Sequence, residues 1–334
     1  MIERGADCKV ADKVRILGTG MYVPEKVVTN DELSHIVDTN DEWISSRTGI
    51  KERRVTQGED LKTLAYKSAL AALQDSHVNK EELDLIIVAT SSQTQNFPSI
   101  ACEVQGMLGA KNAAAFDLLA ACSGFIYALS CAKAHINSGM YKKVLIIGTE
   151  VLSNVLNWED RNTCVLFGDG ASAMILGNSD KEQVPKIILG ADGTGADMLT
   201  CGCRDLDTPF VNEKIINDKS IKMDGRGVFK FAVSTIDKCV KELLEKEQLK
   251  IQDIDYIVCH QANYRIIESV SKRLNVDMNK FYINLHKYGN TSSASIGIAF
   301  DEMNKKNMLT KGKRLILVGF GAGLTYGAAL INLI

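Results

Sequence analysis

Short apolar runs rich in β-branched residues alternate along this chain with longer stretches whose apolar positions repeat at helical spacing. Runs of the first kind predict strands at 14–17, 85–89, 144–147, 256–259 and 315–318. Stretches of the second kind, such as 64–73 and 229–244, predict amphipathic helices. Strands that alternate with helices indicate an α/β fold, and we expect a largely parallel sheet with helices on its faces.

Three segments occur twice in the same order, which indicates an internal duplication. They are LDLIIVAT (83–90) with IDYIVCHQ (254–261), KKVLIIG (142–148) with KRLILVG (313–319), and LFGDGASAMIL (166–176) with GFGAGLTYGAAL (319–330). A period of about half the chain predicts two fused copies of one βα unit about a pseudo-twofold axis, and not a solenoid. We expect an N-terminal tail at 1–13, one half at 14–180 and a second half at 181–334.

The first copy carries additional chain between its second and third repeated segments. This insertion runs from Thr149 to Val165, whereas the second copy passes directly from strand to glycine-rich turn. Long connections of this kind often carry function, so the insertion is a candidate cap or tunnel wall.

The duplication also predicts where an active site lies. AAFDLLAACSGFIYAL (114–129) and FYINLHKYGNTSSASIGIAF (281–300) occupy the same place in the two copies, with Cys122 and Asn290 at about the same point. His260 follows another strand of the second copy. A pseudo-twofold axis would bring these three side chains to one centre.

Each member of this group has a plainer interpretation. Cys122 could be an inert core cysteine, although small neighbours and a helix that starts just after it favour a thiolate nucleophile. His260 could be structural, and Asn290 could be only a turn residue. The turn from Gly319 to Gly323 offers N–H groups to an oxyanion or is simply a tight turn. Their coincidence with the duplication favours the catalytic interpretation.

Composition narrows the class of protein. The chain has 334 residues, is 46% hydrophobic and balances 39 basic with 41 acidic residues, which argues against disorder, nucleic-acid binding and membrane attachment. Nine scattered cysteines form no disulfide framework and indicate a cytoplasmic protein. The CxC of Cys201 and Cys203 has no second ligand pair nearby, so we expect no metal site.

Seven motifs spread over the chain carry a family resemblance. They are TNDEWISSRTGIKER (39–53), LLAACSGF (118–125), DRNT (160–163), FGDGA (167–171), HQANYRI (260–266), GNTSSAS (289–295) and FGAG (320–323). Together they resemble the thiolase-fold condensing enzymes, and among them the β-ketoacyl-[acyl-carrier-protein] synthase III family, which initiates bacterial fatty acid synthesis. The resemblance implies a thiolase-like α/β fold layered α-β-α-β-α.

The same resemblance implies a decarboxylating Claisen condensation. Cys122 would take a short acyl group from coenzyme A, with its oxyanion held by N–H groups of Cys122 and of the 321–323 turn. His260 and Asn290 would donate hydrogen bonds to the malonyl thioester of acyl carrier protein while CO₂ leaves. The product would be 3-oxoacyl-[acyl-carrier protein]; acyl-CoA would be a substrate, and no cofactor is expected.

Related activities differ at these positions. Thiolases need a second cysteine in the C-terminal turn, and none follows Cys259; elongating condensing enzymes pair two histidines, whereas the second position here is Asn290. An initiating enzyme of secondary metabolism and a non-catalytic thiolase-fold scaffold remain alternatives. Dinucleotide binding is disfavoured, because Gly18 and Gly20 lack a third glycine before Pro24.

The resemblance further implies three binding surfaces. Trp43 and Arg161 would sandwich the adenine of coenzyme A, with Thr39 and Arg47 near the nucleotide and Asn263 near the pantetheine arm; Asn263 could equally be only a helix cap. Four basic residues would meet the acidic carrier protein, or form an ordinary solvated face: Lys230, Arg265, Lys272 and Arg273. Phe97 would reach across a homodimer interface into the partner's acyl pocket, or be an ordinary buried aromatic. Arg226 stands where some members have Asn.

Overall fold

Two β-sheets and the helices that cover them make up residues 13–334, the part of the chain that this computed structural model describes. The predicted tail at 1–13 lies outside the described residues except for Lys13, which begins the first strand. The first sheet has the order β1 (Lys13–Tyr22), β7 (Gly170–Ser179), β6 (Lys143–Glu150), β4 (Leu85–Ala89) and β5 (Ala114–Leu118). The second has the order β11 (Tyr256–Cys259), β12 (Arg314–Gly321), β13 (Thr325–Asn332) and β8 (Ile187–Ala191).

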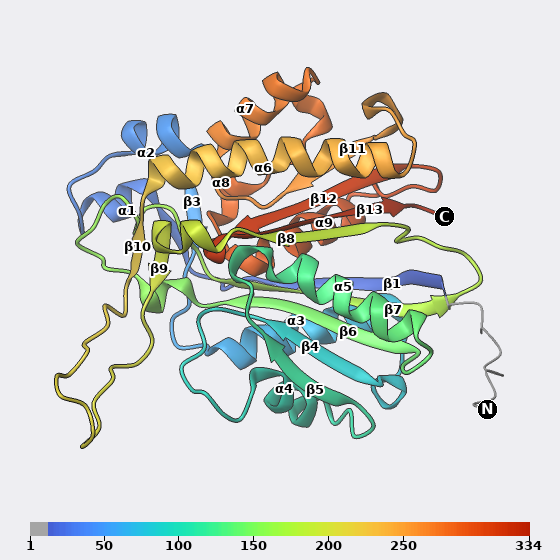
Figure 1. The fold of residues 1–334 in the computed structure, drawn as a ribbon, viewed down its shortest axis with the longest axis horizontal. Coiled ribbons are helices and arrows are strands. Elements are labelled where there is room, and N and C mark those ends of the chain that lie inside the picture. Colours follow the sequence, from blue (N-terminus) through green and yellow to red (C-terminus); the bar gives the residue numbers. More distant parts are fainter. Residues whose placement is uncertain (1–12) are drawn as a thin grey trace, which may run out of the picture.

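Helices form the outer and central layers of a five-layered molecule (Figure 1). The outer helices on the first sheet are α3 (Leu61–Ser76) and α4 (Ile100–Leu108), and those on the second are α6 (Gly225–Lys246) and α7 (Tyr264–Leu274). Between the sheets lie α5 (Gly124–Asn137) and α9 (Ser295–Lys305). The predicted thiolase-like α-β-α-β-α layering is confirmed.

Strand β4 shows why these layers form. All five of its residues are buried, because both of its faces are covered. Ile86 and Val88 pack into the core shared with α3 and α4, whereas Leu85 and Ile87 pack into the central core with α5 and α9. This alternation follows from the period of two along a strand, so one apolar run contributes to two layers.

The prediction of a largely parallel sheet is wrong, because both sheets are mixed. Among the named strands of residues 13–334, the parallel pairs are β4 with β5, β4 with β6, and β11 with β12. The third repeated segment has no crossover helix before it, so β7 and β13 turn back beside β6 and β12 and pair with them antiparallel.

The two sheets repeat the same order. Strands β4, β6, β7 and β1 correspond to β11, β12, β13 and β8. The counterpart of β5 in the second half is reduced to one parallel bridge between Ile257 and Phe281. Strand β5 is the last in the order of the first sheet and is therefore an edge strand. Phe116 of this strand and the following Leu119 are exposed.

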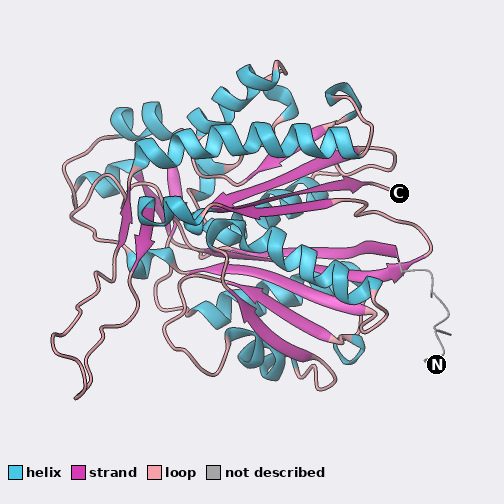
Figure 2. Cartoon of the chain, viewed as in Figure 1, coloured by secondary structure: helices cyan, strands magenta, loops and turns pink. Residues whose placement is uncertain are grey.

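Smaller elements gather at the end of the sheets that carries the site. The hairpin of β2 (Val27–Thr29) and β3 (Glu52–Arg54) encloses α1 (Asn30–Ser34) and α2 (Asp41–Thr48). The hairpin of β9 (Leu199–Cys201) and β10 (Ile221–Met223) carries a long loop that projects from the body in Figure 2. Short helices complete the chain: η1 (Lys80–Glu82), η2 (Ala121–Ser123), η3 (Leu152–Val155), η4 (Gly193–Met198), η5 (Ile251–Asp253), η6 (Met278–Lys280), α8 (Leu285–Tyr288), η7 (Ser292–Ala294) and η8 (Ala322–Leu324).

No helix among residues 13–334 has the length and apolarity that a membrane span requires.

Candidate active site

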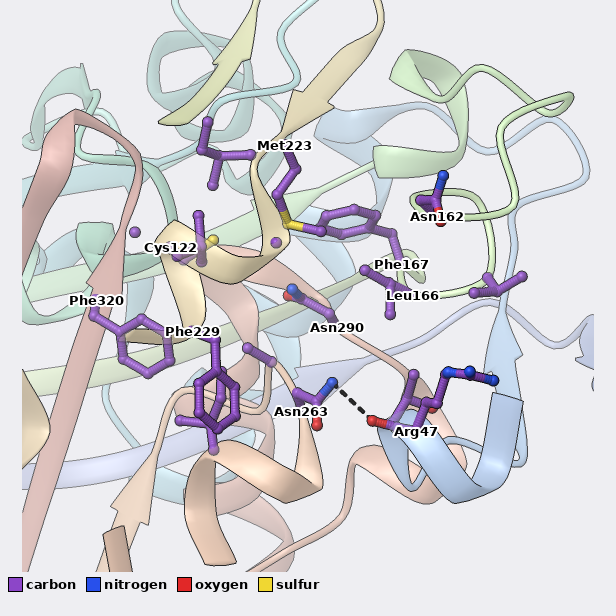
Figure 3. Close-up of a pocket in the computed structure, with 18 of the residues that line it drawn as sticks. Arg47, Cys122, Asn162, Leu166, Phe167, Met223, Phe229, Asn263, Asn290 and Phe320 are labelled. Atoms are coloured by element: carbon purple, nitrogen blue, oxygen red, sulfur yellow. Dashed lines mark hydrogen bonds between the residues drawn. The ribbon is translucent and has the colours of Figure 1, made fainter. Parts of the chain in front are cut away.

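A pocket of about 300 Å³ lies where the ends of both sheets meet the α2 and β10 regions. Cys122 and Phe320 line one end of it and Arg47 and Asn162 the other (Figure 3). Most of the wall between them is apolar and comes from Val165, Leu166, Phe167, Leu199, Met223, Val228, Phe229 and Ile266. Asn162 and Val165 belong to the predicted insertion, so its C-terminal end forms part of the wall.

Cys122 lies in η2, the short turn that precedes α5, and only 8% of it is exposed. Ala121 before it has a φ of 44°, an uncommon value for a residue with a side chain. Burial raises the pKa of the Cys122 thiol to about 12. Burial thus opposes the thiolate that the sequence predicts at the start of α5, because it disfavours the charged form of the sulfur.

Gly321 packs directly on this cysteine. A Cβ built at position 321 would lie 2.7 Å from the backbone nitrogen of Cys122, so only glycine allows the end of β12 to approach so closely. Gly321 lines the pocket, whereas Ala322 and Gly323 follow it in η8. Of its three predicted residues, Gly321 is thus the one that packs on Cys122 and lines the pocket.

His260 follows β11 directly and is buried. Its backbone N–H donates to the Val318 carbonyl, and its Nδ1 lies 2.7 Å from the hydroxyl of Ser295 in α9. Burial lowers the pKa of His260 to about 3, so the imidazole is neutral near pH 7. Its ring packs edge-to-face with that of Phe320, with ring centres 5.1 Å apart.

Asn290 is held by its backbone and by its own amide oxygen. Its N–H donates to the Leu166 carbonyl over 2.8 Å, and its Oδ1 accepts a 2.8 Å hydrogen bond from the N–H of Ser292. This bond orients the amide and leaves the Nδ2 donor for the pocket, which Asn290 lines together with Cys122 (Figure 3).

The predicted equivalence of Cys122 and Asn290 is wrong by three residues. Ser292 has a φ of 46° and matches Ala121 in the other half, so Ser293 is the counterpart of Cys122. Asn290 lies three positions before Ser293, in the turn that leads into η7. This half therefore lines the pocket with a residue of the turn and not with the residue equivalent to Cys122.

The candidate coenzyme A residues stand at the far end of the pocket. Trp43, Arg47 and Asn263 line it. The guanidinium groups of Arg47 and Arg161 lie 4.5 and 5.3 Å from the centre of the Trp43 ring. Arg161 also pairs with Asp38, so the predicted adenine sandwich requires Arg161 to move away from Trp43.

Two further candidates have local structural roles. The Asn263 side chain caps α7 by accepting from the Arg265 N–H, and its Nδ2 donates to the Arg47 carbonyl (Figure 3). It is thus both a cap and a pocket residue. Thr39 lies before α2, outside the pocket wall, and among the described residues its buried hydroxyl oxygen has no hydrogen-bond partner.

The four basic carrier-protein candidates are exposed on α6 and α7. Lys272 pairs with Glu268 of its own helix, and the Arg265 Nε donates to the Ser46 carbonyl. Arg273 instead pairs with the buried carboxylate of Asp237, which gives it a structural role. Lys230 and Arg226 are exposed on the first turns of α6, beside pocket residues of the same helix.

Phe97 is 83% exposed and lies outside the pocket wall of its own chain, so it is not an ordinary buried aromatic.

Sequence reasoning missed a buried polar cluster next to Cys122. Its centre is Glu150 at the end of β6, surrounded by hydroxyl groups that include Ser92 and Ser293. A carboxylate that ends the apolar run KVLIIGTE was the available signal, since a charge there is buried with its strand. The Ser295 contact to His260 was also missed.

Within residues 13–334 there is no group of three or more His, Cys, Asp or Glu placed to hold a metal ion.

Comparisons with known proteins agree with this geometry. Residues 116–193 match the family described as 3-oxoacyl-[acyl-carrier-protein (ACP)] synthase III, and residues 244–333 match its C-terminal family. The chain is 55% identical to a β-ketoacyl-[acyl-carrier-protein] synthase III of Clostridium acetobutylicum, covering 96% of this chain and 99% of the relative. It is 54% identical to that of Clostridium novyi, covering 96% and 98%.

Solved structures of similar proteins match this fold over nearly the whole chain. The 3-oxoacyl-[acyl-carrier-protein] synthase III of Aquifex aeolicus is 43% identical with a TM-score of 0.90, covering 96% of this chain and 99% of that one. The priming β-ketosynthase of the R1128 polyketide pathway is 34% identical with a TM-score of 0.91, covering 98% of both chains.

Proposed function

The chain belongs to the β-ketoacyl-[acyl-carrier-protein] synthase III family, whose members are condensing acyltransferases that initiate fatty acid synthesis. We propose that Cys122 is the residue to which the acyl group is attached during the reaction. One observation carries the proposal: the Cys122 thiol and the Asn290 amide line the same 300 Å³ pocket, which leads outward to Trp43 and Arg47. A thioester substrate that enters past Trp43 and Arg47 would reach the Cys122 sulfur with its acyl group.

In the first half-reaction the Cys122 sulfur attacks the carbonyl of a short acyl-CoA, and coenzyme A leaves. Negative charge develops on the carbonyl oxygen, and the backbone N–H groups of Cys122 and of the 321–323 turn would stabilise it. The contact of Gly321 with Cys122 supports this assignment, because it brings the turn to the sulfur.

In the second half-reaction a malonyl thioester of acyl carrier protein loses CO₂. The electrons of the broken bond pass to the thioester oxygen, so the site needs hydrogen-bond donors and no base. Neutral His260 can donate from Nε2 if its Nδ1 accepts from the Ser295 hydroxyl, 2.7 Å away. Asn290 would donate from Nδ2. The carbanion then attacks the acyl-cysteine and releases 3-oxoacyl-[acyl-carrier protein].

Acyl carrier protein and coenzyme A would bind at the mouth of the pocket. Trp43, Arg47, Arg161 and Asn263 would hold coenzyme A, with Thr39 nearby, and acyl-CoA is consumed as a substrate with no resident cofactor. The exposed Lys230, Arg265 and Lys272 would contact the acidic carrier protein. Arg273 would instead stabilise this part of the fold through its ion pair with Asp237.

We also infer a cytoplasmic homodimer. The free edge of β5 with exposed Phe116 and Leu119 favours strand pairing with a second copy, and Phe97 is exposed where it can reach a partner. Eight described cysteines are free, as in a reducing compartment.

Intact-mass measurement tests the function. After brief incubation with acetyl-CoA, isobutyryl-CoA or a longer acyl-CoA, the protein should gain one acyl group, which peptide mapping should place on Cys122. Acylation of Cys102, Cys164 or Cys259 in preference to Cys122 would contradict the assignment.

A further inference from the structure

Two hydroxyl groups join the turn that carries Cys122 to the turn that follows β12. Ser123 comes directly after the nucleophile and is fully buried, and Thr325 begins β13. Their side-chain oxygens lie 2.8 Å apart. The Ser123 hydroxyl also lies 2.7 Å from the Ala120 carbonyl oxygen, and the Thr325 hydroxyl lies 2.9 Å from the Ala322 carbonyl oxygen. Polar contact therefore runs from one turn, through two side chains, to the other.

Two hydroxyl protons are enough to join these turns. Each hydroxyl has one proton to donate and can also accept. The Ala120 carbonyl already accepts from the Ser123 N–H over 3.1 Å, so the Ser123 hydroxyl can donate to Thr325. Thr325 can then donate to the Ala322 carbonyl or to that of Ala120, which is 3.0 Å away. Both side chains are satisfied by hydrogen bonds within this group of residues.

The turn after β12 gains from such contacts, because glycines constrain its backbone only weakly. Gly321 and Gly323 flank Ala322, and Gly323 has a φ of 131°, which residues with side chains rarely adopt. Backbone hydrogen bonds between Leu324 and Asp192 hold the outer end of the turn. Near Cys122, the Thr325 hydroxyl contacts the Ala322 carbonyl. Because a peptide unit is planar, holding this carbonyl also orients the N–H of the next residue.

The equivalent contact in the other copy is built without hydroxyl groups. The matching turns before α5 and α9 place Ala294 at the position of Ser123. The last paired residues of β6 and β12 face Gly170 and Thr325, which are therefore equivalent. Ala294 and Gly170 have no hydroxyl, so the fold of the repeated unit does not depend on this pair. The two hydroxyls instead accompany the turn that carries the nucleophile.

We propose that Ser123 and Thr325 are positioning residues that hold the two groups of oxyanion donors at a fixed separation. These donors are the N–H groups of Cys122 and of the 321–323 turn, so the inference rests on the proposed acylation of Cys122 and deepens it. Neither hydroxyl lines the pocket, and each acts through the backbone that it contacts. Donors that are displaced from the developing oxyanion stabilise it less, which slows attack by the sulfur.

Separate measurement of the two half-reactions tests this role. We expect Ser123→Ala and Thr325→Val each to slow single-turnover acylation by saturating acetyl-CoA about tenfold, less than the loss of a donor itself. The acetyl-CoA concentration that gives half the maximal rate should not change. Release of CO₂ from malonyl-carrier protein without acyl-CoA should keep the wild-type rate, because its donors are His260 and Asn290. The double variant should be little slower than either single variant, since the two hydroxyls act as one unit.

Two further variants distinguish positioning from folding. Thr325→Ser keeps the hydroxyl and should be acylated faster than Thr325→Val. Ser68→Ala removes a buried hydroxyl that contacts the Ala65 carbonyl within α3, and it should leave both half-reactions unchanged. Wild-type acylation rates in Ser123→Ala and Thr325→Val, or a parallel loss of acylation and CO₂ release, would overturn the positioning role. Absence of acylation in the wild type would instead overturn the proposed function.

Discussion

The turns before α5 and α9 have one backbone conformation and different chemistry. Ala121 and Ser292 share the same unusual φ, near 45° in both, and the next residue is Cys122 in one half and Ser293 in the other. Cys122 lines the pocket, whereas the Ser293 hydroxyl lies within hydrogen-bonding distance of the Ala89 carbonyl and of Glu150. Duplication thus supplied two turns of the same conformation, and of these two only the Cys122 turn presents its side chain to the pocket.

The strands that face these turns differ in a complementary way. Gly148 and Gly319 occupy equivalent positions, and each lets its strand approach the turn of the other half, at Ser293 and at Ser123. Two residues later the first half has Glu150 and the second has Gly321. The thiol therefore needs a bare backbone on one side, while the serine turn forms a hydrogen bond to the buried carboxyl group of Glu150.

Removing the cysteine should have the largest effect. We expect Cys122→Ala to reduce acyl transfer to the uncatalysed background, because no other side chain in the pocket can form the thioester. Adding Ser293→Cys to this variant should not restore acylation, since position 293 faces Glu150 and not the pocket. Intact-mass analysis of both variants measures this, and acylation of the thiol introduced at position 293 would contradict the difference between the two turns.

Loss of a hydrogen-bond donor from the C-terminal copy should have the next largest effect. His260→Ala or Asn290→Ala should slow malonyl decarboxylation on the order of 100 to 1,000-fold, the usual result of losing one hydrogen bond to a developing oxyanion. Acylation of Cys122 should remain measurable in both. Normal CO₂ release together with lost acylation would show that these roles are reversed.

A methyl group at Gly321 should damage the site by overpacking. Its Cβ would meet the Cys122 nitrogen at 2.7 Å, so we expect Gly321→Ala to lower the free energy of unfolding by about 1–3 kcal/mol and to slow acylation. Gly106→Ala in α4 is the control, because no atom lies within 4 Å of its added methyl. Urea unfolding of both variants provides the measurement, and equal stabilities would contradict the close packing.

Removal of positive charges from α6 and α7 should affect only the use of malonyl-carrier protein. Lys230→Ala, Arg265→Ala or Lys272→Ala should each raise the KM for malonyl-carrier protein a few-fold, more at low salt, and leave acyl-CoA use unchanged. Lys111→Ala, an exposed lysine of the first half, is the control. Arg273→Ala should lower stability instead, because Asp237 stays buried without this partner. Equal losses with both substrates would indicate a pocket defect.

Phe97 in the first half should affect only the acyl partner, with the smallest change. Phe97→Ala or Phe97→Thr should shift starter use toward longer acyl-CoA chains, because removal of a ring from a packed dimer site leaves a cavity. Competition among acyl-CoA starters before and after the substitution measures the shift. An unchanged chain-length profile would exclude Phe97 from the acyl pocket.

Periodicity and repeats predict the strands, the outer helices and the duplication well, because each records burial directly. Strand direction is not predicted in this way, since an apolar run such as 315–318 looks the same whichever way its neighbour points. The candidate residues Cys122, Asn290 and Gly321 do meet at one pocket, and His260 packs on Phe320 of its wall. The pair of Glu150 and Ser293 escaped notice because a buried carboxyl group and a hydroxyl become hydrogen-bond partners only when two distant segments fold together.

The burial of the Cys122 thiol matters for inhibitor design. Small electrophiles that rely on an already ionised thiol should react slowly here, because little of Cys122 is exposed and burial raises the pKa of its sulfur. An effective covalent inhibitor therefore gains little from a more reactive warhead. It needs affinity for the apolar wall between Phe229 and Phe167, so that residence beside the sulfur compensates for slow bond formation.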